Sequence, residues 1–142
     1  MKLIIPGRLP GLNEIIRAAK MGKGRYQPYS EMKHEYGDAI TLLAQRLPKC
    51  GTVKLLIKWY EPDSRRDIDN IAAGGTKLIM DSLVNAGVIK DDSQKYVKGI
   101  AHEFAVDKHN ARIEVEIMEV DGKCGTFTRI AIYTTGSNCK PH

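Results

Sequence analysis

The sequence predicts a single α/β (α+β) domain, in which a mixed β-sheet of about four to five strands carries two helices. Three observations predict this fold class. The chain has 142 residues, which fits one domain with one core. Hydrophobic residues make up 42%, near the globular norm. Strand-like and helix-like segments alternate along the chain in the order β-α-β-α-β-β, with room for one more strand at the end.

Composition narrows the class of protein. The net charge is +5 and the pI about 9.1, which is compatible with nucleic acid binding. The three cysteines are odd in number and contain no Cys-x-x-Cys pair, and the four histidines lack ligand spacing, so we expect reduced thiols and no zinc site. No apolar run approaches the roughly 18 residues of a membrane span. The apolar run at the N-terminus is too short for a signal peptide. We therefore expect a cytoplasmic protein with no membrane partner.

The first segments mix strand and loop character. Leu3-Ile4-Ile5 begins a strand, which prolines and glycines soon interrupt. Residues 14–25 contain helix formers together with two glycines, and they form the most basic stretch of the chain. Lys20, Lys23 and Arg25 lie in it. Two interpretations are open: a mobile arm that contacts DNA, or a solvated basic loop.

The middle of the chain predicts a helix and then a strand. Residues 30–47 have one apolar face at helical spacing, with Ser30 as the expected N-cap and Pro48 ending the helix. Residues 52–60 (TVKLLIKWY) are rich in β-formers. In that strand Val53, Leu55, Ile57 and Trp59 are expected to point to one side.

The second half predicts a helix followed by strands. A helix is expected from about Asn70 to Ala86, ended by Gly87 at the C′ position. Residues 97–106 and 111–120 are strand-like, and the short connection between them predicts an antiparallel hairpin. Residues 126–134 are compatible with a last strand.

An acidic motif carries the chemistry. Asp67 and Asp69 are two residues apart, and in an extended backbone this spacing places both side chains on one side, with Ile68 turned into the core. Two carboxylates on one side can share a divalent cation, and hard oxygen ligands suit magnesium or manganese. The alternative is that Asp69 caps the next helix and Asp67 is a solvated loop residue.

The helix after the motif continues the polar surface. Asn70, Lys77 and Asp81 fall on one face at about 100° per residue. Lys77 is expected either to stabilise charge on a phosphate or to form an ordinary ion pair with Asp81.

The acidic pair Asp91-Asp92 follows this helix. It supplies either a third metal ligand or a capping turn. Lys95 and Lys98 come soon after it and are candidates for contact with the DNA backbone.

Taken together, these motifs resemble one family. The ordered set RRDIDN (65–70), K-x-x-x-D-S-L (77–83) and N-A-G-V-I-x-D-D-S (85–93) resembles the RusA family of Holliday-junction resolvases. The likeness spans most of residues 1–120, which we expect to form a RusA-like endonuclease domain. Residues 121–142 are then a C-terminal extension, with an added strand and a flexible end as the expected content.

The resemblance implies a magnesium-dependent endonuclease that acts as a homodimer, and the oxygen ligands themselves would also suit manganese in place of magnesium. Its expected substrate is the four-way DNA junction, cut by paired symmetric nicks in recombination and repair. The family's three essential aspartates fall on Asp67, Asp69 and Asp92, and its functional lysine falls on Lys77. One departure is that residues 71–76 separate the Asn from the Lys by about four more positions than the compact motif, close to one helical turn. Two adjacent glycines there could bulge or delay the helix.

Two other functions remain open from the sequence. One is a magnesium nuclease for other branched or flapped DNA. The other is a non-catalytic DNA-binding accessory protein, whose acidic residues serve only as caps and ion pairs. Metal-dependent cutting of a synthetic junction separates them from the resolvase.

Overall fold

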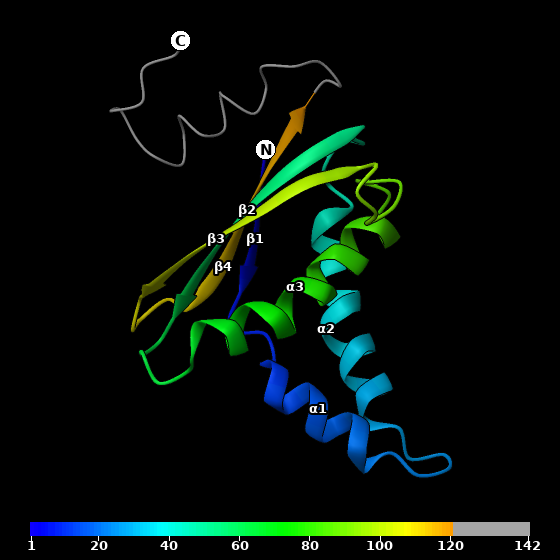
Figure 1. Cartoon of the computed structure of the whole chain (residues 1–142), viewed down its shortest axis with the longest axis vertical. Coiled ribbons are helices and arrows are strands. Elements are labelled where there is room, and N and C mark those ends of the chain that lie inside the picture. The colour runs from blue at the N-terminus through cyan, green and yellow to red at the C-terminus, as the bar shows by residue number, and fades with distance from the viewer. Residues whose placement is uncertain (121–142) are drawn as a thin grey trace.

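The structure, a computed structural model, describes residues 1–120 of the chain (Figure 1). They form one mixed sheet and three helices, so the expected fold class is confirmed with one helix more. In chain order the elements are β1 (Lys2–Pro6), α1 (Leu12–Met21), α2 (Pro28–Ala44), β2 (Thr52–Glu61), α3 (Ile68–Asn85), β3 (Val97–Val106) and β4 (Arg112–Val120). The strand proposed at 126–134 lies outside the described residues.

The four strands have the order β1-β4-β2-β3. β4 runs antiparallel to both β1 and β2, whereas β3 runs parallel to β2. β2 is thus a central strand. Its residues Val53, Leu55, Ile57 and Trp59 are at most 1% exposed, which confirms the expected inward face.

The predicted hairpin of residues 97–106 and 111–120 is wrong. β2 lies between β3 and β4, because the connection through α3 returns β3 parallel to β2 on one side while β4 pairs with β2 on the other. The short link after β3 crosses the end of β2, where the Asp107 N–H donates to the Glu61 carbonyl (2.8 Å). The most apolar strand gains two hydrogen-bonded neighbours this way, which a local hairpin would not provide.

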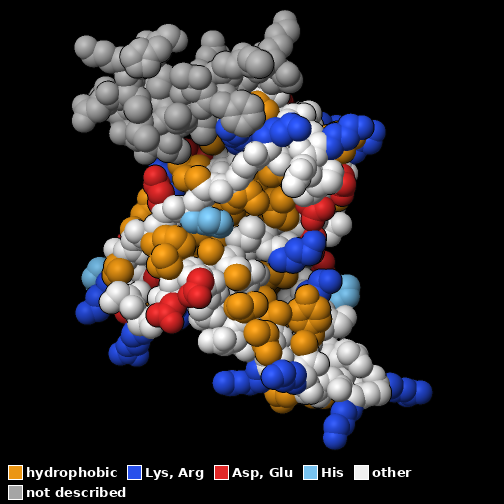
Figure 2. Space-filling model, in the orientation of Figure 1, with side chains coloured by type: hydrophobic (Ala, Val, Ile, Leu, Met, Phe, Trp, Pro, Cys, Tyr) orange, Lys and Arg blue, Asp and Glu red, His pale blue; other side chains and the backbone are white. Residues whose placement is uncertain are grey.

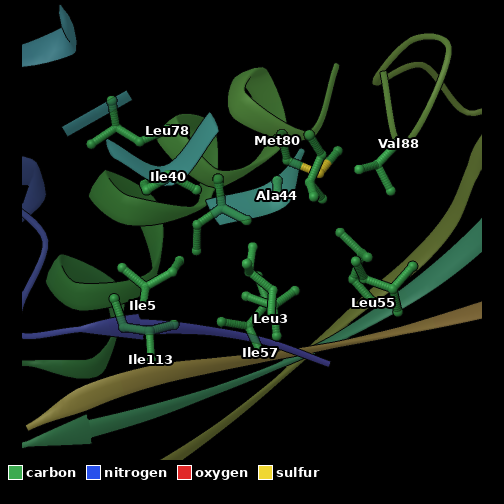
Figure 3. Packing of buried hydrophobic residues seen from close by; sticks show 14 of the residues in the cluster. Leu3, Ile5, Ile40, Ala44, Leu55, Ile57, Leu78, Met80, Val88 and Ile113 are labelled. Carbon is green, nitrogen blue, oxygen red and sulfur yellow. The ribbon is translucent and has the colours of Figure 1, made fainter. Parts of the chain in front are cut away.

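The core lies between the sheet and helices α2 and α3 (Figure 3). Leu3, Ile5 and Ile57 rise from the strands toward Ile40 of α2 and Leu78 of α3. All five side chains are at most 5% exposed. Burial of this apolar surface, at roughly 25 cal/mol per Å², fixes α3 over the sheet and with it the position of the acidic motif.

Helix α1 corrects the loop interpretation of the basic stretch. Residues 12–21 are helical, and Lys20 lies in the last turn. Lys23 and Tyr26 then form a tight turn by two mutual backbone hydrogen bonds of 2.8 Å. Helix α2 also starts earlier than expected, because Pro28 occupies its first turn behind the N-cap Gln27, so Ser30 is not the cap.

Helix α3 is continuous from Ile68 to Asn85, so the adjacent glycines neither bulge nor delay it. They serve close packing instead. A Cβ on Gly74 would lie 2.6 Å from the Pro10 carbonyl oxygen, and one on Gly75 would lie 2.6 Å from the Trp59 ring. The helix ends as expected at Gly87, whose φ is +79°. Within residues 1–120, no helix has the length and apolar character that crossing a membrane requires.

Candidate active site

One face of α3 and the edge strand β3 line an open cavity of about 550 Å³. Asp69, Thr76 and Lys77 supply the polar part of the α3 wall, and His102 faces them from β3. The remaining lining comes from Ala72, Ala73, Met80, Ile100 and Asp92. The α3 residues follow one another at helical spacing, which is why a single helix can present them together.

Lys77 joins two carboxylates at the mouth of this cavity. Its Nζ lies 3.1 Å from Asp81 and 3.1 Å from Asp92, which approaches from the turn before β3. The hydrogen bonds that Lys77 donates to these carboxylates raise its own pKa, and the bond to Asp92 lowers the pKa of that carboxyl. Both groups are therefore charged at neutral pH.

Asp92 and Asp91 occupy different positions. Asp92 lines the cavity beside β3 and also a larger cavity of about 690 Å³ between α2 and α3, in which Lys33 and His34 take part. Asp91 lines only the larger of these two cavities. The structure thus brings Asp69, Lys77 and Asp92 together around one hollow.

Asp67 does not take the position that its spacing predicted. It is the N-cap of α3, and Asp69 lies in the first helical turn, so the two are not on one side of an extended segment. Ile68, expected in the core, is 61% exposed. The reason is that the helix starts at Ile68 and changes the period of the side chains from two to 3.6.

Carboxylate oxygens have the chemistry that magnesium or manganese prefers. Asp69 and Asp92 fit such an ion, since both line the same cavity. Within residues 1–120, however, no three His, Cys, Asp or Glu side chains are arranged as a group that could hold a metal ion. Asp67 is not among the residues that line this cavity.

Arg66 and Asn70 have a positioning role that the sequence did not indicate. Arg66 donates to Glu61 Oε1 (3.2 Å) and to the Leu9 carbonyl (3.1 Å), and Asn70 Oδ1 accepts from the Asn13 N–H (2.9 Å). Asn70 therefore faces the start of α1, about two helical turns before Lys77. These contacts tie the acidic motif to the first residues of α1.

His102 is a second residue of the site that the sequence did not indicate. Ile100, His102 and Phe104 occupy every second position of β3 and share its side that faces α3. A polar residue at an inward position of a strand is the pattern that could have indicated it. Trp59 Nε1–H donates to its Nδ1 (3.0 Å).

The candidate DNA-contacting residues lie on the surface. Lys20, Lys23, Arg25, Lys95 and Lys98 are all exposed. Lys95 also lies over the Tyr96 ring, with Nζ 5.5 Å from its centroid. Figure 2 shows Lys and Arg side chains around the margin of the face that α3 and β3 form, with several at the end where α1 lies.

Comparisons with known proteins bear on the family of this chain. Two crystal structures of the periplasmic domain of Helicobacter pylori MotB are similar at 17% and 14% identity, with TM-scores of 0.36 and 0.38. They cover 93% and 95% of this chain and 90% and 83% of their own, and at these scores they carry no argument. No match was found among curated proteins. The model of the family described as "Endodeoxyribonuclease RusA" matches residues 17–118. That match contains the acidic motif, Lys77, Asp92 and His102, and the chain belongs to the RusA family of endodeoxyribonucleases.

Proposed function

We propose that this endodeoxyribonuclease hydrolyses phosphodiester bonds at four-way DNA junctions in a metal-dependent reaction, and so acts in DNA recombination and repair. The observation that carries the proposal is the convergence of Asp69, Lys77 and Asp92 on one open cavity beside an edge strand. The cavity is open and partly apolar, with charged groups at its mouth. Such a cavity suits a single phosphodiester group of a DNA strand.

Asp69 and Asp92 are the residues proposed to hold a divalent cation. Asp67, at the N-cap of α3 and outside the lining of this cavity, is proposed as the third carboxylate on the resemblance of the motif alone. Magnesium is the expected ion and manganese the second. Such an ion lowers the pKa of a bound water and stabilises charge on the leaving oxygen. Asp91, exposed beside Asp92, is not assigned to the site.

Lys77 has a separate proposed role. Its charge is maintained by two ion pairs, yet its side chain is 64% exposed and can reach a bound phosphate. A cation beside a phosphate contributes most when charge builds up in the transition state. While no substrate is bound, the same ammonium group offsets part of the charge of Asp92 and Asp81, which reduces repulsion between the carboxylates.

DNA binding is proposed to rely on the exposed basic residues around the face that α3 and β3 form. Lys20 lies in the last turn of α1, Lys23 and Arg25 follow that helix, and Lys95 and Lys98 follow the acidic turn. Contacts from such side chains to phosphates release counterions and depend strongly on salt. Lys95 and Lys98 are close in sequence to residues that line the cavity, and α1 packs on α3, so both groups can hold the arms of a junction around it.

A homodimer is the proposed assembly. A four-way junction needs two opposed cuts, and a C2 dimer presents two identical sites. Exposed apolar side chains on α1 are compatible with such an interface: Ile16 is 42% and Met21 51% exposed. Analytical ultracentrifugation of the full chain tests this part, and a monomer at cleavage-competent concentrations would rule out the paired mechanism.

The experiment for the proposed function compares three synthetic DNAs: a four-way junction, a flap and a plain duplex. Each is incubated with the protein in magnesium and again in EDTA. Symmetric nicks in the junction alone, and only with magnesium, are expected. Preferential cutting of the flap would favour the alternative of a nuclease for other branched DNA. Junction binding without cutting in magnesium or manganese would favour the non-catalytic alternative.

A further inference from the structure

His102 is the one histidine that lines the cavity of Asp69, Lys77 and Asp92 among the residues that the structure describes. Its ring is stacked with two others, with centroids 6.1 Å from Trp59 and 6.3 Å from Phe104, both at 27° to it. Trp59 is in turn packed against Gly75 of α3. The imidazole therefore has a fixed position relative to the helix that carries Asp69 and Lys77.

The hydrogen bond to Trp59 also determines which ring nitrogen carries the proton. An indole N–H can only donate, so Nδ1 of His102 must be the acceptor in the 3.0 Å bond. The proton of the neutral ring is then on Nε2. Burial lowers the pKa of His102, which favours the neutral form further.

The Nε2–H group is thus a donor that remains available. Within residues 1–120 no hydrogen bond engages it, and it is not a buried atom without a partner. The cavity that the ring lines is mostly apolar, with Ala72, Ala73 and Ile100 around it. A hydrogen bond formed among such side chains is stronger than one in open water.

We propose that His102 is a further catalytic residue, which donates its Nε2–H to a non-bridging oxygen of the phosphodiester held between Asp69, Lys77 and Asp92. The proposal rests on the proposed function of this site. His102 acts as a neutral donor and transfers no proton, so its contribution is to stabilise charge on the phosphate oxygen and to orient the group.

Two substitutions separate this role from a purely structural one. The amide nitrogen of Gln can occupy the place of Nε2, so His102→Gln keeps a donor toward the cavity. The amide oxygen of Asn can occupy the place of Nδ1, so His102→Asn keeps the acceptor for Trp59 but has no donor at the place of Nε2. A structural role predicts rescue by Asn, and a catalytic role predicts rescue by Gln.

The measurement is the single-turnover cutting rate of a synthetic four-way junction in magnesium, at saturating full-length protein. His102→Asn is expected to be slower by on the order of a hundredfold, with junction affinity unchanged, while His102→Gln stays within a few-fold of wild type. His109, exposed in the β3–β4 turn, provides the control, and His109→Asn is expected to cut at the wild-type rate. Equal rates for the Asn and Gln variants, whether both fast or both slow, would overturn the proposal.

A second measurement keeps His102 in place, so its result does not depend on whether a His102 variant folds. Nitrogen-15 NMR of histidine-labelled Asp69→Asn protein should show Nδ1 unprotonated and Nε2 protonated, and the Nε2–H signal should shift on addition of the junction. An unshifted signal in the bound complex would overturn the role of His102. Failure of the wild-type protein to cut any junction in magnesium would instead reject the proposed function itself.

Discussion

Lys77 is held by two carboxylates that come from different parts of the chain. Asp81 is one helical turn further along α3, and Asp92 belongs to the turn before β3. The pair with Asp81 could be read from its i,i+4 spacing, whereas the pair with Asp92 depends on how the chain returns to the sheet. Because most of the Lys77 side chain is exposed, these pairs contribute little to stability. Their effect is on the charges at the mouth of the cavity.

Lys77→Met tests that effect. The single-turnover cutting rate is expected to fall on the order of a hundredfold or more, because the substitution removes one electrostatic interaction with the transition state. Junction affinity should change little. The pKa of Asp92 should rise toward its ordinary value, which carbon-13 NMR of the carboxylates can follow. A rate within about twofold of wild type would leave Lys77 as a surface ion pair only.

Asp92 and Asp91 provide a matched pair of neighbouring carboxylates. Asp92→Asn is expected to reduce cutting by a large factor, since Asp92 lines the cavity with Asp69 and pairs with Lys77. Asp91→Asn removes the same charge from an exposed position and should have a mild effect. The junction-cutting rates of both variants in magnesium check the prediction. Equal, mild decreases in rate would indicate that the two aspartates only cap a turn.

At the scale of elements, α3 connects the motif to the rest of the fold. Its residue Gly74 lets the backbone of residues 10–12 approach, and Gly75 lets Trp59 approach. The N-terminus of α1 is held by the same helix through Asn70. Close packing at these two glycines therefore positions both the acidic motif and the Trp59–His102 pair.

Gly74→Ala is expected to destabilise the protein by about 1–3 kcal/mol, because the new Cβ meets backbone atoms at 2.6 Å that cannot move alone. Gly37→Ala in α2 is the control, since its Cβ would meet only Ser82 Oγ at 3.9 Å. The control should be neutral or stabilise by up to about 1 kcal/mol. Urea unfolding of the two variants measures the difference, and equal free energies would contradict the close packing of α1 on α3.

The sequence predicted much of the fold at this scale but not the pairing of its strands. The inward face of β2 and the end of α3 at Gly87 followed from period and from glycine, which are local properties. The position of β4 did not, because only the requirement for neighbours on both sides of β2 places it there. Asp69, Lys77 and Asp92 could be named from motifs, whereas His102 depends on a packing interaction with Trp59 that spacing does not encode.

At the scale of the whole molecule, the distribution of charged side chains determines how the protein approaches DNA. Basic residues number 22 and acidic residues 17, yet the acidic side chains of α3 and the following turn gather at the two neighbouring cavities that Lys77 and Asp92 both line. Figure 2 shows positive side chains at the margin of that face. This arrangement attracts phosphates over a distance and leaves the centre available to a divalent cation.

Substitution of Lys20, Lys23 and Arg25 by Gln together tests the contribution of the segment around the end of α1. The slope of log affinity against log salt for junction binding is expected to decrease by up to about 2.7, or roughly 0.9 for each phosphate that the variant no longer neutralises. The same number of charges removed at Arg46, Lys49 and Lys108 serves as the control. Identical slopes for the two triple variants would show that the segment makes no specific interaction with phosphates.

The hollow beside α3 is, in this proposed function, the place where the junction is cut. The most direct measurement compares wild-type protein with Asp69→Asn on a synthetic four-way junction in magnesium, with binding and cutting recorded on the same samples. The predicted result is that both proteins bind the junction and only the wild type nicks it, since the amide keeps the shape of the side chain and loses the charge. Cutting by Asp69→Asn at a rate near that of the wild type would contradict the assignment of this hollow as the active site.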